Sequence, residues 1–163
     1  TDPAYPGGTY EDVIFQYRNA ERLEAKGMEV SVERGLKERW GGFFNFSYSQ
    51  TKDKQTGLRL INSPEFMANL GLNYQWVKNR FTSSLEFQYV DKRKAYDGQI
   101  AGSYVNTNLS FAFKKVTEVL DVSLFIRNLF DVKIFDPIFG DYYPVVLMKQ
   151  DGRTFNIRVS LNL

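Results

Sequence analysis

The chain has 163 residues, of which 43% are hydrophobic and 16% aromatic, with 21 basic and 19 acidic residues. The length suits one compact unit, and the formal net charge of +2 is too small to indicate nucleic acid or an anionic surface as partner. Cysteine and histidine are absent, which excludes disulfides, thiolate metal sites and any mechanism that needs an imidazole base within the chain.

The first 35 residues predict a loop followed by β structure. Residues 1–8 have the Pro, Gly and Asp content of a loop. Apolar residues then alternate at odd positions from Val13 to Tyr17 and at even positions from Met28 to Val32. One strand over 10–35 would need an extra residue to change parity, and Gly27 is the natural place for such a bulge. The bulge would put these residues on one face: Leu23, Ala25, Met28, Val30 and Val32. The alternative is two strands joined by a hairpin turn at Asn19-Ala20.

Six further segments alternate apolar and polar residues with a period of two, which is typical of strands with one apolar face. They span residues 40–50, 66–76, 81–89, 105–113, 120–126 and 153–163. The connections between neighbouring segments are short at 36–39, 77–79 and 114–118, and long and polar at 51–63, 91–102 and 131–152. In transmembrane barrels, short periplasmic turns alternate with long extracellular loops in this way.

The apolar face of these six segments has roughly thirty positions, and none of them is Asp, Glu, Lys or Arg. A lipid environment would impose this exclusion, because a charge at the bilayer midplane costs about 2–4 kcal/mol. Aromatic residues collect at the ends of that face and predict two membrane girdles. One comprises Trp40, Trp76, Phe81 and Phe113 beside the short turns, and the other Tyr48, Phe66, Tyr89 and Phe155 beside the long loops.

The opposite face is mostly Asn, Ser, Gln and Gly with scattered charges. A soluble sandwich or lipocalin-like barrel would be richer in Lys, Glu and Thr on its solvated face, so the composition favours a hydrated, confined lumen. Six charged residues are expected on this lumen side, either as wall charges that compensate one another or as the lining of a transport path. They are Glu29, Glu33, Glu86, Asp121, Arg127 and Arg158.

The last segment is apolar on one parity as far as the final residue. An unprotected strand of this kind would aggregate, so we expect it to be paired on both sides or embedded in lipid. We interpret it as the terminal strand used in barrel assembly, with an apolar face made of Phe155, Ile157, Val159, Leu161 and Leu163.

Four motifs resemble a known family when they are taken in order. Residues 19–29 contain Asn19 and the Gly27-Met28-Glu29 of an N-x7-G-x-E strand, and Ser63-Pro64-Glu65-Phe66 precedes a strand. The other two motifs are R-N-L-F-D at 127–131 and G-R-T-F at 152–155. Together they resemble the C-terminal end of a TonB-dependent outer-membrane receptor barrel. One departure is Leu163, where that family usually ends in Phe.

The resemblance implies an all-β fold of about seven or eight antiparallel up-and-down strands from a barrel of about 22 strands. Residues 1–163 would be a C-terminal fragment without the plug domain or the TonB box. It implies the Gram-negative outer membrane and active uptake of a ferric siderophore, cobalamin or a glycan. The implied partners are the remaining strands and plug, lipid, the TonB complex and the barrel-assembly machinery.

Two other functions are weighed. A self-contained barrel acting as a passive pore or anchor would need an even strand number, and therefore eight strands. An outer-membrane hydrolase is disfavoured by the absence of histidine, and we find no catalytic constellation, cofactor motif or metal-ligand spacing.

Asn128 is interpreted as ending a strand and Asp131 as capping the next turn. Loop residues that could touch a substrate are Asp136, Asp141, Tyr142 and Tyr143.

Overall fold

The computed structural model describes residues 22–138 and 146–162, and it is built from strands alone in these ranges. Seven long strands form the main sheet: β1 (Leu23–Lys37), β2 (Trp40–Asp53), β3 (Phe66–Val77), β4 (Phe81–Val90), β7 (Tyr104–Thr117), β8 (Leu120–Arg127) and β11 (Thr154–Leu161). Four short strands lie in the long loops: β5 (Arg93–Lys94), β6 (Ile100–Ala101), β9 (Phe135–Pro137) and β10 (Leu147–Lys149). Among the described residues, no helix is long and apolar enough to cross a membrane.

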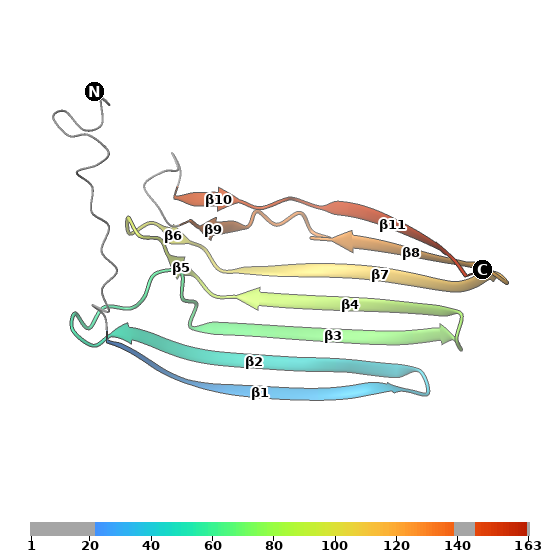
Figure 1. The fold of residues 1–163 in the computed structure, drawn as a ribbon, viewed down its shortest axis with the longest axis horizontal. Coiled ribbons are helices and arrows are strands. Elements are labelled where there is room, and N and C mark those ends of the chain that lie inside the picture. The colour runs from blue at the N-terminus through green and yellow to red at the C-terminus, as the bar shows by residue number, and fades with distance from the viewer. Residues whose placement is uncertain (1–21, 139–145, 163) are drawn as a thin grey trace, which may run out of the picture.

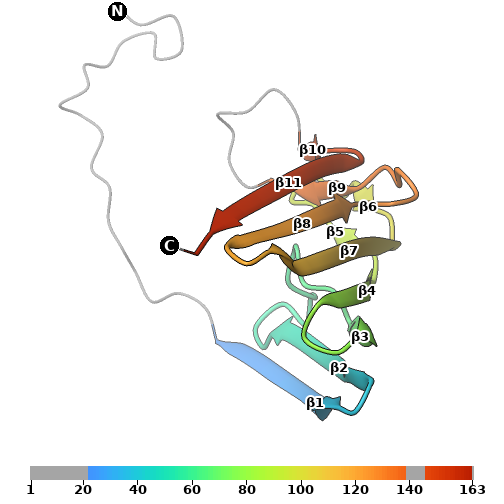
Figure 2. The same ribbon diagram turned by 90° about the vertical axis from the view of Figure 1, so that its right-hand side faces the viewer.

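The seven long strands form an antiparallel meander in the order β1-β2-β3-β4-β7-β8-β11 (Figure 1). Turned by 90°, the strands follow one another along an arc (Figure 2). The short turns lie at one end of the sheet, while the long loops with β5, β6, β9 and β10 lie at the other. We call these the short-turn end and the long-loop end. The predicted alternation of short and long connections is therefore confirmed.

The short turns depend on residues with left-handed backbone angles. Glu38 has φ 56° between β1 and β2, and Asn79 has φ 55° between β3 and β4. Lys115, with φ 51°, lies where the pairing of β7 with β8 changes register between Phe113 and Thr117. Asparagine tolerates this region better than most residues, so Asn79 suits its position.

The predicted bulge at Gly27 is wrong. The pairing of β1 with β2 runs without a shift from Leu23 opposite Asp53 to Arg34 opposite Gly42. Leu23 and Ala25 therefore lie on the face opposite Met28, because the side-chain period is two. Gly27 has a different role, since a Cβ there would overlap the main-chain oxygen of Tyr48. The Asn19-Ala20 hairpin lies outside the described residues and stays a prediction.

The sheet has no hydrophobic core of its own. No large side chain is fully buried among the described residues, and the buried apolar side chains are Val90, Ala95, Ala101 and Ile134 at the long-loop end. Many large hydrophobic side chains of the long strands are exposed instead. A single exposed layer of this kind needs a covering, because contiguous apolar patches of soluble monomers are small.

Candidate functional site

Strand register collects the apolar residues on one face, which we call the outer face. Val32 is opposite Phe44, Phe44 is opposite Leu70, and Leu70 is opposite Phe87. The same alignment continues through β7 and β8 to β11, where Ile126 is opposite Phe155. Residues in register share a face. The uncharged apolar positions of six separate segments thus form one continuous surface.

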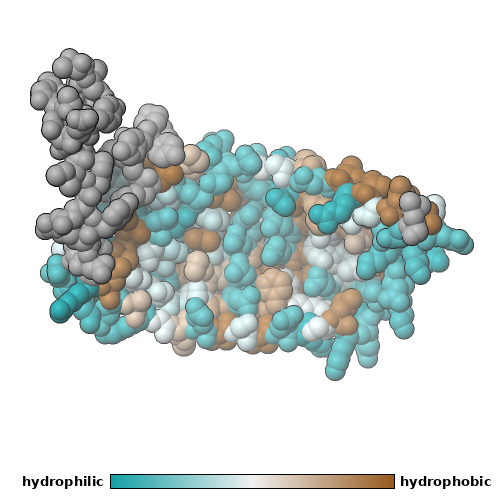
Figure 3. Space-filling model, viewed as in Figure 1, coloured by the Kyte–Doolittle hydropathy of each residue, from teal (hydrophilic) through white to brown (hydrophobic). Residues whose placement is uncertain are grey.

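The outer face is most open along β11. Ile157 is 73% exposed and Leu161 65% exposed. Figure 3 shows hydrophobic residues along this edge of the molecule and hydrophilic residues over much of the face in view. In the described sheet, β11 pairs only with β8, so its other edge keeps unpaired backbone groups. Such an edge is suited to pairing with a further strand.

Aromatic rings form a row across the outer face at the short-turn end. The ring of Tyr74 lies 4.9 Å from Trp40 and 4.7 Å from Trp76, both edge-on. The row continues from Trp76 to Phe81 at 6.2 Å and from Phe81 to Phe113 at 4.6 Å. Offset and edge-on pairs at these distances are favourable. Tyr74, which the sequence analysis did not assign to a girdle, joins the two tryptophans.

Aromatic residues at the long-loop end are more scattered. Tyr48 and Phe66 lie 5.0 Å apart, and the hydroxyl of Tyr89 lies 3.3 Å from Asp91 Oδ1. The Arg153 guanidinium lies 5.9 Å from the centre of the Phe155 ring. These positions suit an interfacial belt, where aromatic rings need both apolar and polar surroundings. The assignment of both girdles to the membrane interface stays a prediction.

The opposite, inner face carries the six predicted charges. Glu86 accepts a hydrogen bond from Asn108 Nδ2 at 3.3 Å, and Asp121 accepts one from the main-chain N–H of Lys115 at 2.8 Å. The guanidinium of Arg158 lies 5.6 Å from the centre of the Phe125 ring. Within the described part of the chain no two of the six form an ion pair with each other, so they do not neutralise one another directly.

The R-N-L-F-D motif ends β8 through Asn128, which is buried and has φ 50°. The Asn128 side chain donates to the main-chain oxygen of Val132 and accepts from its N–H, both at 2.9 Å. Its own N–H donates to Asn108 Oδ1 at 3.1 Å. These bonds close the turn as a backbone pair would, which agrees with the predicted structural role of Asn128.

Asp131 does not act as the sequence analysis predicted. Its carboxylate accepts a hydrogen bond from the N–H of Arg153 at 2.8 Å, instead of capping the next turn. A Cβ on Gly152 would overlap this carboxylate, so a larger residue there would require the Asp131 side chain to shift. The two sequence motifs therefore contact each other and fasten the start of β11 to the end of β8.

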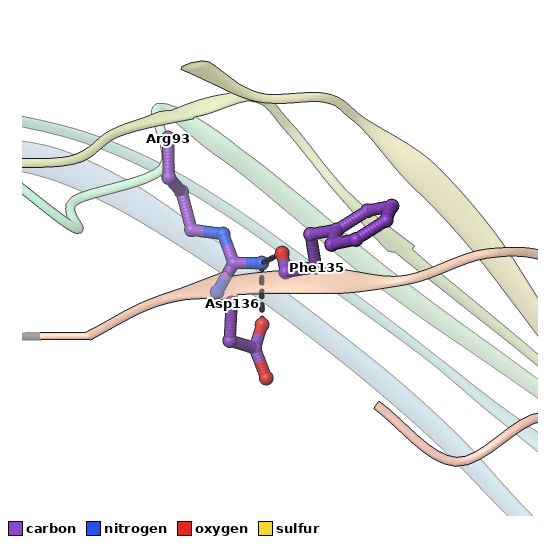
Figure 4. A network of polar contacts seen from close by, with 3 residues as sticks. All are labelled: Arg93, Phe135 and Asp136. Atoms are coloured by element: carbon purple, nitrogen blue, oxygen red, sulfur yellow. Dashed lines mark hydrogen bonds and ion pairs between the residues drawn. The ribbon is translucent and has the colours of Figure 1, made fainter. Parts of the chain in front are cut away.

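A partly buried ion pair joins two of the long loops (Figure 4). Arg93 Nη2 lies 2.6 Å from Asp136 Oδ1 and donates to the main-chain oxygen of Phe135 at 2.9 Å. Its guanidinium lies 5.8 Å from the centre of the Tyr104 ring. The side chain of Arg93 is 10% exposed and that of Asp136 is 36% exposed. Arg93 was missed because it lies in a polar stretch 43 residues from its partner, and no local pattern marks it.

This ion pair changes the interpretation of the loop candidates. The carboxylate of Asp136 is engaged by Arg93, so its first role is to hold the loops together. Asp141, Tyr142 and Tyr143 lie outside the described residues. Beside Asp136 is a hollow of about 270 Å³ whose lining includes Asn106, Arg127 and Asp151. The side-chain oxygen of Asn106 is buried there without a hydrogen-bond partner. The hollow could bind a polar group.

The described residues contain no cluster of three or more Asp, Glu, His or Cys side chains that could hold a metal ion. The chemistry available on the inner face is therefore polar and ionic contact, from amides, hydroxyls and the guanidinium groups of Arg127 and Arg158. On the outer face it is apolar contact with an aromatic border.

An outer face without charge on the six predicted segments from residue 40 onward, a polar inner face and alternating connections define the wall of an outer-membrane β-barrel. The chain belongs to the family of TonB-dependent receptor-like β-barrels, whose family model matches residues 1–129. Members of this family are transporters of the Gram-negative outer membrane and not enzymes.

Comparison with individual proteins agrees with this assignment. The chain is 28% identical to the heme/hemopexin utilization protein C of Haemophilus influenzae over 93% of its own length and 21% of that protein. The ferric yersiniabactin uptake receptor FyuA of Yersinia pestis matches 88% of the chain with a TM-score of 0.75 and 20% identity. The siderophore receptor PiuA of Acinetobacter baumannii matches 84% with a TM-score of 0.68 and 18% identity. The chain covers 24% of FyuA and 21% of PiuA. It thus spans about a fifth to a quarter of these relatives.

Proposed function

We propose that the protein to which this wall belongs takes up a scarce substrate actively across the outer membrane. The observation that carries the proposal is the pair of faces made by the strand register within a TonB-dependent receptor barrel. The outer face would contact lipid, and the inner face would line the path or contact a plug. Residues 1–163 would be the C-terminal portion of the barrel.

An iron-bearing chelate is the substrate class that we favour over cobalamin or a glycan. The relative at 28% identity is named for heme and hemopexin, and structural relatives are named for a siderophore and for ferric yersiniabactin, with one named for copper. The chain lacks histidine and cysteine, so it offers no imidazole or thiolate to a heme iron. Arg127 and Arg158 are exposed on the inner face without ion-pair partners among the described residues. Guanidinium groups are well suited to carboxylates of an anionic chelate.

The partners follow from this function. The remaining barrel strands would pair with the free edges of β1 and β11, and a plug would fill the lumen. The TonB complex would supply energy through the part of the protein outside this chain. The barrel-assembly machinery would recognise the terminal strand, including Phe155, Ile157, Val159, Leu161 and Leu163.

Growth under iron limitation tests the function. Cells lacking the receptor gene are supplied with hemin, with a ferric siderophore or with an iron salt as the iron source, in strains with and without TonB. We expect loss of growth on one chelate alone, restored by the gene only when TonB is present. Growth that is unchanged on every iron source, or restoration without TonB, would contradict the proposal.

A charge substitution connects the test to this chain. Arg127→Gln should lower uptake of the chelate, because Arg127 lines the hollow of the inner face beside Asp136. Lys115→Gln removes an exposed charge at the short-turn end and serves as the control. Equal uptake by both variants would show that Arg127 does not contribute to the transport path. The denatured mass is a second check, since a band of this chain's own mass in native membranes would favour a small passive barrel.

A further inference from the structure

Charge is distributed unequally between the two ends of the sheet. The three short turns and the strand ends beside them carry seven basic residues, Arg34, Lys37, Arg39, Lys78, Arg80, Lys114 and Lys115, against Glu38, Glu118 and Asp121. We call the seven the basic rim. All seven are exposed, and none forms an ion pair within the described residues. The small net charge of the whole chain conceals this local excess.

The long-loop end is different, because its charges pair with each other. Every ion pair of the described residues lies there, including Lys54 with Glu24, Arg59 with Glu65 and Arg93 with Asp136. The basic rim therefore lacks the internal partners that the other end has. Figure 3 shows hydrophilic residues gathered at the short-turn end. A partner with negative charge would complement the rim.

A groove on the outer face leads to this rim. Gly42 lies between Arg34 on β1 and Leu72 on β3 in the same row of paired residues, and it has no side chain to fill the row. The resulting hollow of about 430 Å³ is lined by the side chains of Val32, Arg34, Trp40, Phe44, Leu70 and Leu72. Its volume lies within the range of about 300–1,000 Å³ that is usual for small-molecule sites.

The groove has three features that together suit one class of ligand. Its floor and most of its walls are apolar, Arg34 lies at its short-turn end, and Trp40 belongs to the aromatic row that borders the outer face. In a barrel, short turns face the periplasm, where the membrane leaflet consists of phospholipid. All the lining residues come from β1, β2 and β3, so the groove is complete without strands from outside this chain.

We propose that the groove over Gly42 binds one anionic phospholipid of the periplasmic leaflet. An acyl chain lies against Val32, Leu70 and Leu72, and the headgroup phosphate accepts hydrogen bonds from Arg34. Guanidinium groups bind phosphate in a bidentate manner, which an ammonium group cannot match. The other cations of the basic rim hold the surrounding anionic headgroups without a defined site.

Native mass spectrometry of the full-length receptor tests this site. The receptor is purified from outer membranes in mild detergent and titrated with phosphatidylglycerol or with phosphatidylethanolamine. We expect one phosphatidylglycerol to be retained with several-fold preference. Arg34→Gln should weaken that binding about fivefold, the contribution of one basic residue near an anionic surface. Arg34→Lys should restore only part of it.

Two further variants separate the site from general electrostatics. Arg22→Gln removes one charge just before the other end of β1 and should leave binding unchanged. Val32→Phe fills the groove from an exposed position and should weaken binding with no change in charge. Every variant is first checked for heat-modifiable migration, which reports a folded barrel. Unchanged binding in Arg34→Gln, equal retention of the two phospholipids, or retention of lipopolysaccharide in their place would overturn the proposal.

Discussion

At the scale of single residues, the structure explains why particular polar side chains lie inside turns. Asn128 replaces a backbone pair where β8 ends, and Asp131 holds the N–H of Arg153. Both have positive φ, at 50° and 53°. Their motif is therefore a structural junction between β8 and β11, and substitutions there should act on stability before they act on transport.

Asn128→Gly tests this role with Asn79→Gly as the matched control. Both asparagines have left-handed backbone angles, and glycine accepts these without strain. Asn128→Gly loses two hydrogen bonds of a buried side chain and should destabilise the folded receptor by about 1–3 kcal/mol. Asn79 is exposed in a short turn, so its replacement should be nearly neutral. Denaturant unfolding midpoints measure the stability of both variants. Equal midpoints would contradict the role of Asn128 in the junction between β8 and β11.

Arg93 allows a second prediction about one side chain. Arg93→Met leaves Asp136 and the main-chain oxygen of Phe135 without their shared donor. We expect faster amide exchange in both β5–β6 and β9–β10, because the ion pair joins their loops. The coupling in a cycle with Asp136→Asn should be about 1–2 kcal/mol, below a fully buried pair because Asp136 is 36% exposed. Lys94→Met is the control, and exchange that rises only in β5–β6 would contradict the link.

At the scale of elements, neighbouring strands contribute to one aromatic row. Phe81 on β4 is central to it, with rings of Trp76, Phe111 and Phe113 at 6.2, 6.3 and 4.6 Å. The row crosses four strands of the sheet, β2, β3, β4 and β7. It therefore stabilises the short-turn end in addition to marking a border of the outer face.

Phe81→Ala and Phe87→Ala form a matched pair on β4. Both residues are half-buried on the outer face, but Phe87 has no ring contact among the described residues. Aromatic pairs contribute about 0.5–1.5 kcal/mol beyond their buried area. The unfolding free energy should therefore fall more in Phe81→Ala than in Phe87→Ala, by about 1–2 kcal/mol. Equal losses in denaturant titrations would mean that the row adds nothing to apolar burial.

Elements also show what local sequence could and could not predict. The six long strands from β2 to β11 and their faces were predicted correctly, because alternation with a period of two is a local property. The bulge at Gly27 was wrong since the register of β1 is set by pairing with β2, and a change of parity within one stretch does not reveal that pairing. The ladders β5–β6 and β9–β10 are too short to give a periodic signal, so they were missed.

At the scale of the whole molecule, the apolar outer face and the two edges of the sheet need a covering. Its large apolar side chains are exposed, and its described edges at β1 and β11 are not paired with each other. Lipid, a filled lumen and further strands would satisfy these needs together. The motifs that carried the family resemblance were predictive, while Arg93 and the basic rim emerged only from the three-dimensional arrangement.

A pair of charge substitutions tests the difference between the faces. Leu70→Arg places a charge near the middle of the outer face, and Asn69→Arg places it at the adjacent residue on the inner face. In a bilayer the first should cost about 2–4 kcal/mol and the second little. The fraction of receptor that migrates as folded barrel without heating measures the effect. Similar fractions for both variants would argue against a lipid-facing outer surface.

A spin-label scan along β4 tests the central claim most directly, that one face of this sheet contacts lipid. Single cysteines are introduced at positions 82 to 89 of a full receptor from which any cysteine outside this chain has been removed, and they are labelled within bilayers; the chain itself has no cysteine. At each position we measure how often the spin label collides with oxygen, which concentrates in lipid, and with a nickel chelate, which stays in water. We predict that oxygen access peaks at 83, 85, 87 and 89 and falls at 82, 84, 86 and 88. Access without this alternation, or with the opposite parity, would contradict the account.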